Sequence, residues 1–252
     1  MATVAIIGDV GGCLEQLAAA VDALDDPATV VVQVGDLVDR GPDSSGVLSY
    51  VGDRLAGGRW VQLVGNHDAQ YVGKELQPFW PERLADGDAA LLRGWWLRDR
   101  LRVAAAVRTS EGEELLVTHA GLSRRAWGEL GDPVTAGTAA ALLNTRPEPL
   151  LWADDGPLWT EAGTNLYPGW LEEVGPPMPF SQVHVHSSIV DWDRTVWRCR
   201  EHLRDRSTVD WAARHTVTRA GGARFIAVDP RHGKRGAAAW SPLILRGATL
   251  LE

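Results

Sequence analysis

Six short apolar runs, most of them rich in β-branched residues, end in a residue that can bind a metal ion. The runs, each with the residues that follow it, are Val4–Ile7 with Gly8-Asp9, Val30–Val34 with Gly35-Asp36, Trp60–Val64 with Gly65-Asn66-His67-Asp68, Leu115–Val117 with Thr118-His119, Val183 with His184-Val185-His186, and Phe225–Val228 with Asp229. Such runs are typical of buried strands, and helical patterns lie between them, for example from Ser44 to Leu55. Alternating strands and helices favour a layered α/β fold, whose ligands sit beyond the carboxyl ends of the strands. We therefore expect the six polar ends to converge on one edge of the fold.

Length and composition limit the classes of protein that the chain can belong to. With 252 residues, 45% of them hydrophobic, a single domain over residues 1–252 is the simplest organisation. The apolar runs fall short of the about 18 residues that a membrane span needs, and the N-terminus is typical of a first strand rather than a signal peptide. A net charge of -8 argues against nucleic-acid or anionic-membrane partners. Cys13 and Cys199 are too few for a disulfide framework, so we expect a cytoplasmic protein.

Two segments interrupt the alternation of strands and helices. Residues 69–100 are predicted to be a helical insertion with Pro and Gly breaks, and residues 124–180, rich in Pro, Gly and Trp, are predicted to be irregular. Within the first segment, Trp80, Trp95 and Trp96 are either core anchors or the lining of a substrate cleft.

Seven side chains at the strand ends are hard or borderline metal ligands: Asp9, Asp36, Asn66, His67, His119, His184 and His186. Such a set suits Mn, Fe, Zn or Co. Two metal ions need a bridging carboxylate, for which Asp36 is the natural candidate. Asp39 and Arg40 follow in the same loop, and the planar fork of an arginine holds phosphate oxygens. The residues thus indicate a metal site with a phosphate-binding group beside it.

Three blocks of sequence contain most of these residues: GDLVDRGPDS at 35–44, GNHD at 65–68 and THAGL at 118–122. They resemble the signature blocks of the calcineurin-like metallophosphoesterases, and most closely the branch of serine/threonine protein phosphatases and diadenosine-tetraphosphate hydrolases. LLWADDGPLW at 150–159 and VHVHSS at 183–188 resemble later blocks of that branch. The resemblance covers roughly residues 4–245 and implies a four-layered α/β-β/α sandwich, with two central sheets flanked by helices.

The resemblance also implies two divalent metal ions, with Mn as the first candidate and Fe, Zn, Co or Ni as alternatives. Asp9 and Asp36 would hold the first ion, and Asp36 would bridge to the second. The site of the second ion would be completed by Asn66, His119 and the histidine of the HS block, His186.

The catalytic roles implied by the resemblance lie in the loops after the second and third runs. His67 would protonate the leaving oxygen and would be oriented by Asp39, while Arg40 and Asn66 would bind the phosphate. This agrees with the chemistry of the residues, because a histidine titrates near neutral pH and can donate a proton to an alkoxide. Two cations about 3.5–4 Å apart would generate a hydroxide and neutralise the attacked phosphoryl group.

One expected metal ligand is missing. The first block of the family usually reads Gly-Asp-x-His-Gly, and its histidine binds the first metal, but here Gly11 stands in that place. Three explanations remain open: His184 compensates, a water fills the gap, or the site holds one metal or is inactive. In an extended segment His184 and His186 would point to the same side, so that one could serve each metal. A structural role for His184 remains equally open.

A second phosphate-binding arginine is also not evident. Relatives often carry one two residues after the Trp of a PLW block, where this chain has Glu161. Arg146 is a possible substitute, although no spacing argument supports it.

The leading hypothesis is a metal-dependent hydrolase of phosphate esters, in which a metal-activated water attacks and His67 is the general acid. The substrate of this phosphatase would be a phosphoprotein, a nucleoside polyphosphate or a small phosphomonoester. The competing hypothesis is a catalytically weak or silent protein of the same fold that binds phosphate or a phosphoprotein, which Gly11 alone supports. The sequence leaves the oligomeric state open.

Overall fold

The structure is a computed structural model that describes residues 2–73, 80–81, 83–171, 175–231 and 240–251. Its strands are β1 (Ala2–Ile7), β2 (Val30–Gln33), β3 (Trp60–Leu63), β4 (Leu101–Arg102), β5 (Ala104–Arg108), β6 (Glu114–Thr118), β7 (Ser181–His184), β8 (Val190–Asp191), β9 (Val196–Trp197), β10 (Ser207–Asp210), β11 (His215–Ala220), β12 (Ala223–Ala227) and β13 (Leu243–Leu251). Its helices are α1 (Leu14–Asp22), α2 (Ser44–Leu55), α3 (Asn66–Val72), α4 (Asp86–Leu97), α5 (Arg124–Glu129), α6 (Ala136–Asn144), α7 (Tyr167–Leu171) and α8 (Glu201–Arg204), with a 3-10 turn η1 at Leu150–Trp152 and a π-helical turn η2 at Ala162–Leu166. A strand lies at each of the six expected runs, and the helix expected from Ser44 to Leu55 is α2.

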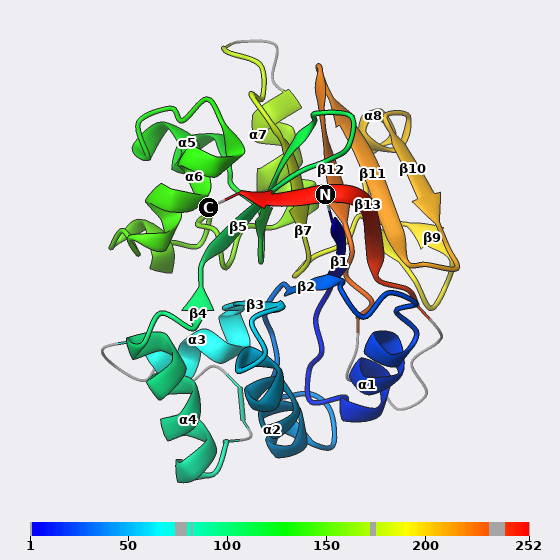
Figure 1. Cartoon of the computed structure of the whole chain (residues 1–252). Coiled ribbons are helices and arrows are strands. Elements are labelled where there is room, and N and C mark those ends of the chain that lie inside the picture. The colour runs from blue at the N-terminus through cyan, green and yellow to red at the C-terminus, as the bar shows by residue number, and fades with distance from the viewer. Residues whose placement is uncertain (1, 74–79, 82, 172–174, 232–239, 252) are drawn as a thin grey trace.

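Within the described residues, eleven strands form one continuous sheet in the order β10-β11-β12-β7-β6-β5-β13-β1-β2-β3-β4. Strand β13 joins its two halves, because Leu245 pairs with Val4 of β1 and Leu250 pairs with Val107 of β5. The two central sheets expected from the sequence are therefore two halves of one sheet that bends along β13 (Figure 1).

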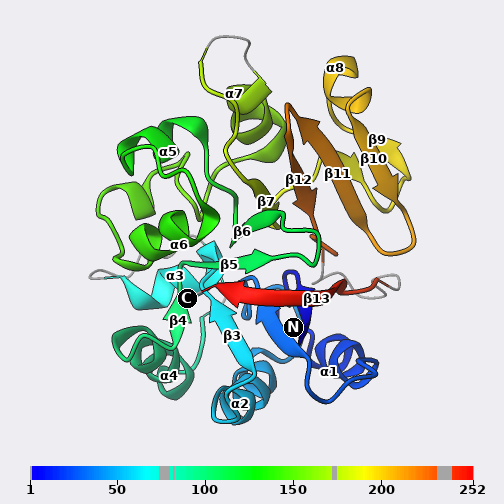
Figure 2. The same ribbon diagram turned by 45° about the horizontal axis from the view of Figure 1, so that its top comes forward.

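The two halves of the sheet pack face to face. The aliphatic core between them includes Val4, Ile6 and Val32 from one half and Val107, Val117 and Val183 from the other. Helices α1, α2 and α4 cover the outer face of the first half, and α5, α6 and α7 cover the outer face of the second (Figure 2). This arrangement gives the expected four layers.

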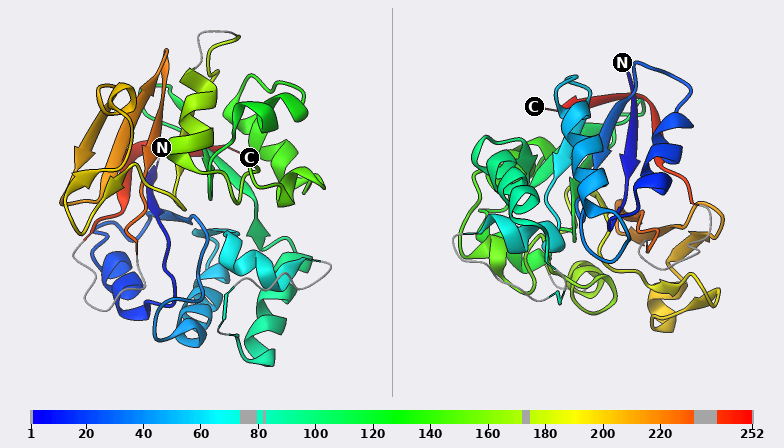
Figure 3. Two further views of the ribbon diagram at one scale, coloured as in Figure 1. Left: turned by 180° about the vertical axis from the view of Figure 1, so that it is seen from behind. Right: turned by 90° about the horizontal axis from the view of Figure 1, so that it is seen from below.

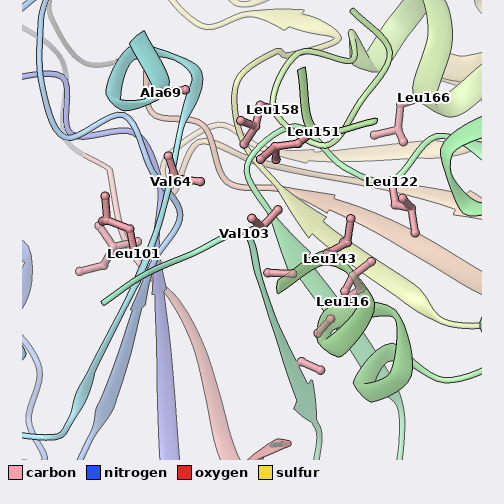
Figure 4. Close-up of a cluster of buried hydrophobic side chains, with 14 of the residues drawn as sticks. Val64, Ala69, Leu101, Val103, Leu116, Leu122, Leu143, Leu151, Leu158 and Leu166 are labelled. Carbon is pink, nitrogen blue, oxygen red and sulfur yellow. The ribbon is translucent and has the colours of Figure 1, made fainter. Parts of the chain in front are cut away.

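The segment 124–180 is more regular than the sequence predicts. It contains α5, α6 and α7, so the expectation of an irregular segment is wrong. Leu143 of α6 packs beside Leu116 of β6 in the outer core, the hydrophobic cluster between the sheet and the helices that cover it (Figure 4). Helix α6 buries mainly alanines, such as Ala136 and Ala139, against the sheet. Because small residues form the buried face, the sequence shows no periodic pattern of large apolar side chains, which is the pattern that indicates a helix.

The predicted insertion at 69–100 is helical at the end of α3 and in α4, while its residues 74–79 and 82 lie outside the described residues. Trp95 and Trp96 of α4 are 3% and 8% exposed and belong to the outer core, so they are core anchors. Trp80 lies elsewhere, edge-on to the ring of His67 with the ring centroids 5.1 Å apart.

The carboxyl ends of the parallel strands meet at one edge of the fold. Strands β1, β2 and β3 run parallel to one another in one half, and β6, β7 and β12 do so in the other. In the view from below, α1 and α2 flank β1 (Figure 3). No helix among the described residues is long and apolar enough to cross a lipid bilayer.

Candidate active site

The turns that follow β1, β2 and β6 bring three predicted ligands to one point. Asp9, Asp36 and His119 are buried, and each offers a ligand atom within 4.8 Å of the other two. Oδ1 of Asp36 lies 3.5 Å from Nε2 of His119, and Oδ1 of Asp9 lies 3.8 Å from Nδ1 of the same ring. Both carboxylates assigned to a first metal ion thus adjoin a histidine assigned to the second.

Three of the four carboxylate oxygens of this group lack hydrogen-bond donors in the described part of the chain. Both oxygens of Asp9 and Oδ2 of Asp36 are buried and accept no hydrogen bond from the described residues. Burial, together with the charges of Asp36 and Asp229, raises the pKa of Asp9 well above its usual range. A buried carboxylate without donors is costly unless a cation compensates its charge. The donor set therefore fits a divalent metal ion.

Asp36 has the electrostatic surroundings of a bridging ligand. Burial alone would raise its pKa, but its pKa is lowered because His119, His67 and Arg40 lie beside it. The backbone N–H of His67 also donates to Oδ1 of Asp36 at 2.9 Å. The Asp36 carboxylate is therefore anionic at neutral pH.

A second group of predicted ligands adjoins the first. Oδ1 of Asn66 lies 2.9 Å from Nε2 of His119 and 3.0 Å from Nδ1 of His186. Burial is the main cause that lowers the pKa of both histidines, that of His186 to about 3. In a neutral ring the Nδ1–H of His119 donates to the carbonyl of Val34 at 2.9 Å, which leaves a lone pair on Nε2. The lone pair of His119 thus lies beside the amide oxygen of Asn66, as expected for two ligands of one cation.

The turn that carries Asp36 has an unusual backbone. Asp36, Asp39 and Arg40 have φ angles of 52°, 68° and 63°, in the left-handed region. Each such residue costs about 1–2 kcal/mol. The turn is held against the one before α1, since the Asp36 carbonyl accepts a hydrogen bond from the N–H of Gly11 at 2.7 Å. A Cβ atom at Gly41 would lie 2.3 Å from the Gly11 carbonyl, so only glycine fits there. Strain of this kind is concentrated at functional sites.

His67 is held in place at both ring nitrogens. Its Nδ1–H donates to Oδ2 of Asp39 at 2.7 Å, and the same oxygen accepts a hydrogen bond from Gln70 at 2.6 Å. The guanidinium of Arg40 contacts Nε2 of His67 at 2.9 Å. This nitrogen lies 4.0 Å from Oδ2 of Asp36, so it faces the carboxylate group. The structure therefore brings all three predicted catalytic residues to the ligand group.

Comparison with known proteins identifies the family. A family model for calcineurin-like phosphoesterases matches residues 2–212. The chain belongs to the calcineurin-like phosphoesterase family. The crystal structure of a mutant cold-active protein tyrosine phosphatase has a TM-score of 0.55 and 18% identity over all of this chain and 81% of that one, which shows a shared fold.

Curated relatives of this phosphoesterase chain include two symmetrical bis(5'-nucleosyl)-tetraphosphatases. The one from Erwinia tasmaniensis is 34% identical over 182 residues, which are 68% of this chain and 60% of the relative. The one from Delftia acidovorans is 33% identical over 152 residues, which are 57% of this chain and 52% of the relative. The matches therefore span 60% or less of the length of these relatives.

The structure does not bring His184 to the ligand group. Nε2 of His184 accepts a hydrogen bond from the hydroxyl of Tyr167 at 2.8 Å, and Nδ1 donates to the Val185 carbonyl at 3.0 Å. The ring is fully buried, which lowers its pKa to about 4. Metal binding by His184 stays a prediction from the sequence, and these hydrogen bonds favour the structural role instead.

We expect His184→Ala to lower the free energy of unfolding by about 1–3 kcal/mol, because it leaves a cavity and removes the Tyr167 hydrogen bond. Bound metal should be unchanged. Thermal unfolding and elemental analysis after dialysis against Mn²⁺ measure the two quantities. Tyr167→Phe removes the same hydrogen bond with less loss of volume and should destabilise less. Loss of a metal equivalent in His184→Ala alone would restore the ligand assignment.

Arg146 does not replace the missing phosphate-binding arginine. Its guanidinium donates to the Trp96 carbonyl at 2.8 Å and stacks on the Trp96 ring at 3.6 Å. It also forms an ion pair of 2.8 Å with Asp99. These contacts tie the guanidinium to the end of α4 and to Asp99.

Sequence reasoning missed two arginines that line a cavity next to His186. A cavity of about 350 Å³ is lined by His186 and Glu161, and also by Arg198, Asp229 and Arg231. The signal for Asp229 was its place after the sixth strand run, whereas no motif marks the two arginines. Among the described residues, Arg198 and Arg231 of this cavity are thus candidates for a second phosphate contact, and both lie outside the family blocks.

Proposed function

We propose that the chain is a metal-dependent phosphoesterase that hydrolyses nucleoside polyphosphates with two divalent ions, Mn²⁺ being the first candidate. The observation that carries this proposal is the set of buried carboxylate oxygens of Asp9 and Asp36 that accept no hydrogen bond from the described residues, with the Asp39–His67 pair beside them. The names of the curated relatives support the substrate class.

The proposed metal site consists of two overlapping ligand groups. Asp9 and Asp36 would hold one ion, and the other would be held by Asp36, Asn66, His119 and His186. When bound, such ions activate a water and neutralise charge on the phosphoryl oxygens. Asp36 supplies the shared carboxylate because it lies between the imidazole of His119 and the turn of Arg40.

Arg40 and Asn66 would bind and orient the phosphate. The guanidinium of Arg40 lies 3.9 Å from the carboxylates of both Asp9 and Asp36, and its side chain is 30% exposed whereas theirs are 2% and 1% exposed. Arg40 therefore covers the buried acids on the solvent side, where a phosphoryl group arrives, and its fork can bind two of the oxygens.

His67 would deliver the proton to the leaving oxygen. Asp39 accepts the Nδ1–H, which fixes the ring and leaves Nε2 as the nitrogen that faces the ligand group. In the structure the guanidinium of Arg40 donates to Nε2 at 2.9 Å. Nε2 would therefore carry and deliver its proton once Arg40 has turned to the bound phosphate.

We expect hydrolysis of para-nitrophenyl phosphate and of a bis(5'-nucleosyl) tetraphosphate when Mn²⁺ is added, and loss of both activities with a chelator. Restoring Mn²⁺ in excess of the chelator should restore both. Phosphate release and chromatography of the nucleotide products measure the two reactions. Binding of phosphate without turnover, under any of the candidate metals, would favour the silent binding protein instead.

The remaining proposals concern organisation and location. A single phosphoesterase domain fits the continuous sheet, in which β13 joins the two halves. The cytoplasm remains the proposed compartment, because Cys13 and Cys199 are not joined in a disulfide.

A further inference from the structure

The Asp9 side of the site lacks the ligand that the family carries at position 11. Gly11 has no side chain, and its φ of 52° lies in the left-handed region. Its N–H donates to the carbonyl of Asp36, so this turn serves to fix the backbone of the Asp36 loop. His184, the expected replacement, is hydrogen-bonded elsewhere. Another residue must therefore supply the missing interaction if a cation binds next to Asp9.

The turn after β12 lies directly against the turn that carries Asp9. A Cβ atom at Gly8 would be 2.1 Å from the carbonyl of Val228 and 2.7 Å from Cδ of Pro230. The residue next to Gly8 is Asp9, and the residue between Val228 and Pro230 is Asp229. Only a glycine at position 8 allows the two turns to approach so closely, and this contact sets the two carboxylates on neighbouring turns.

Asp229 is buried at the boundary between the ligand group and the cavity. It is 3% exposed and lines the cavity together with His186. Its charge raises the pKa of Asp9, after burial and Asp36, and burial raises the pKa of Asp229 itself. Asp229 lies outside the tight group of Asp9, Asp36 and His119, in which all ligand atoms are within 4.8 Å of one another. The site thus has a third buried carboxylate on the side of Asp9.

We propose that Asp229 is an additional carboxylate of the cation site next to Asp9. It supplies the interaction that position 11 lacks. The proposal rests on the proposed function, because it requires that a divalent cation binds there. The buried oxygens of Asp9, which accept no hydrogen bond from the described residues, point to that cation independently of Asp229. A third carboxylate in place of a neutral imidazole makes the site more anionic, which favours hard divalent ions such as Mn²⁺ or Mg²⁺ over Zn²⁺.

The competing role of Asp229 is to shape its own turn. Its Oδ1 accepts a hydrogen bond from the backbone N–H of Arg231 at 2.7 Å. An asparagine can accept this hydrogen bond with its amide oxygen but carries no charge. Asp229→Asn therefore keeps the turn and removes the negative charge, which would act on a bound cation and also acts on Arg40, Arg231 and His119. Asp26 is a matched control, because its Oδ1 accepts from the N–H of Ala28 at 2.8 Å in an exposed turn.

The test is a titration of metal-stripped protein with Mn²⁺, in which binding is measured by calorimetry and by the shift in melting temperature. We expect Asp229→Asn to bind Mn²⁺ about 10- to 100-fold more weakly at one site, with a smaller thermal shift, and Asp26→Asn to match the wild type. Asp229→Ser, which keeps a turn acceptor, replaces Asp229→Asn if the latter does not fold. The readout needs no substrate.

The possible outcomes separate this inference from the proposed function. Suppose that the wild type binds Mn²⁺ and hydrolyses its substrate, and that Asp229→Asn binds Mn²⁺ with the same affinity. This result overturns the role of Asp229 and leaves the proposed function intact. A wild type that binds neither Mn²⁺ nor any other candidate metal overturns both. Equal weakening in Asp26→Asn would mean that the loss follows from a general change in charge, which also overturns the role of Asp229.

Discussion

Asp36→Asn is expected to lose most of the hydrolytic activity and the metal from both subsites. The carboxylate stands between the Asp9 side and the Asn66 side of the site, with His119 3.5 Å from one of its oxygens. Outer partners of metal ligands already contribute about 10- to 100-fold to metal affinity, so losing the shared carboxylate should cost more than about 100-fold. Elemental analysis after dialysis against Mn²⁺ and the rate of phosphate release measure the two effects.

The stabilisation by Mn²⁺ distinguishes this role from a structural one. Asparagine keeps an acceptor for the N–H of His67, which donates to Oδ1 of Asp36. Removing the charge relieves its repulsion of Asp9 but also removes its attraction to His119, His67 and Arg40, which lowers the pKa of Asp36. The metal-free variant should therefore melt lower than the metal-free wild type, and its further stabilisation by Mn²⁺ should disappear. Asp53→Asn, at an exposed position of α2, is the matched control. Full metal content in Asp36→Asn would contradict the bridging role.

The strand-end ligands could be predicted because the sequence encodes them locally. Asp9, Asp36 and Asn66 each follow an apolar run within three residues, and parallel strands end at the same edge of a sheet. The apolar pattern alone therefore indicates that these residues come together. The family blocks added the expected roles, and the structure brings His67, Asp39 and Arg40 to the same place.

The orientation of the two histidines after β7 could not be read from their spacing. Residues two apart share a side only while the strand continues. Strand β7 ends at His184, and His186 has a φ of 68°, in the left-handed region. The chain turns between them, with the N–H of Ser187 donating to the Val185 carbonyl at 2.7 Å. His186 therefore reaches Asn66 while His184 points to Tyr167.

Long-range contacts account for the other features that the sequence did not reveal. The joining of the two half-sheets depends on β13, whose partners β1 and β5 are far from it in the chain. The apolar run before Asp229 marks it as a strand-end residue, but its place against the turn of Asp9 depends on the contact between Val228 and Gly8. Neither contact leaves a pattern within a window of ten or twenty residues, so only the folded chain reveals it.

His67→Asn is expected to reduce turnover by about 100- to 10,000-fold and to leave the bound metal unchanged. His67 contacts Asp39 through one ring nitrogen and faces Asp36 at 4.0 Å through the other, beside the ligand group. Asparagine has no group that can give up a proton near neutral pH, so the leaving oxygen would depart without protonation. Steady-state kinetics under saturating Mn²⁺ and elemental analysis measure the two quantities.

The dependence on the leaving group identifies the loss as one of proton donation. Phenyl phosphate has a more basic leaving group than para-nitrophenyl phosphate and so depends more on an acid in the transition state. The loss in His67→Asn should therefore be larger for phenyl phosphate. His215→Asn, in β11 where the ring contacts the Ser241 carbonyl, is the matched control and should retain wild-type rates. Equal losses for both esters would show that His67 does not act as the acid, and lost metal would show that it is a ligand instead.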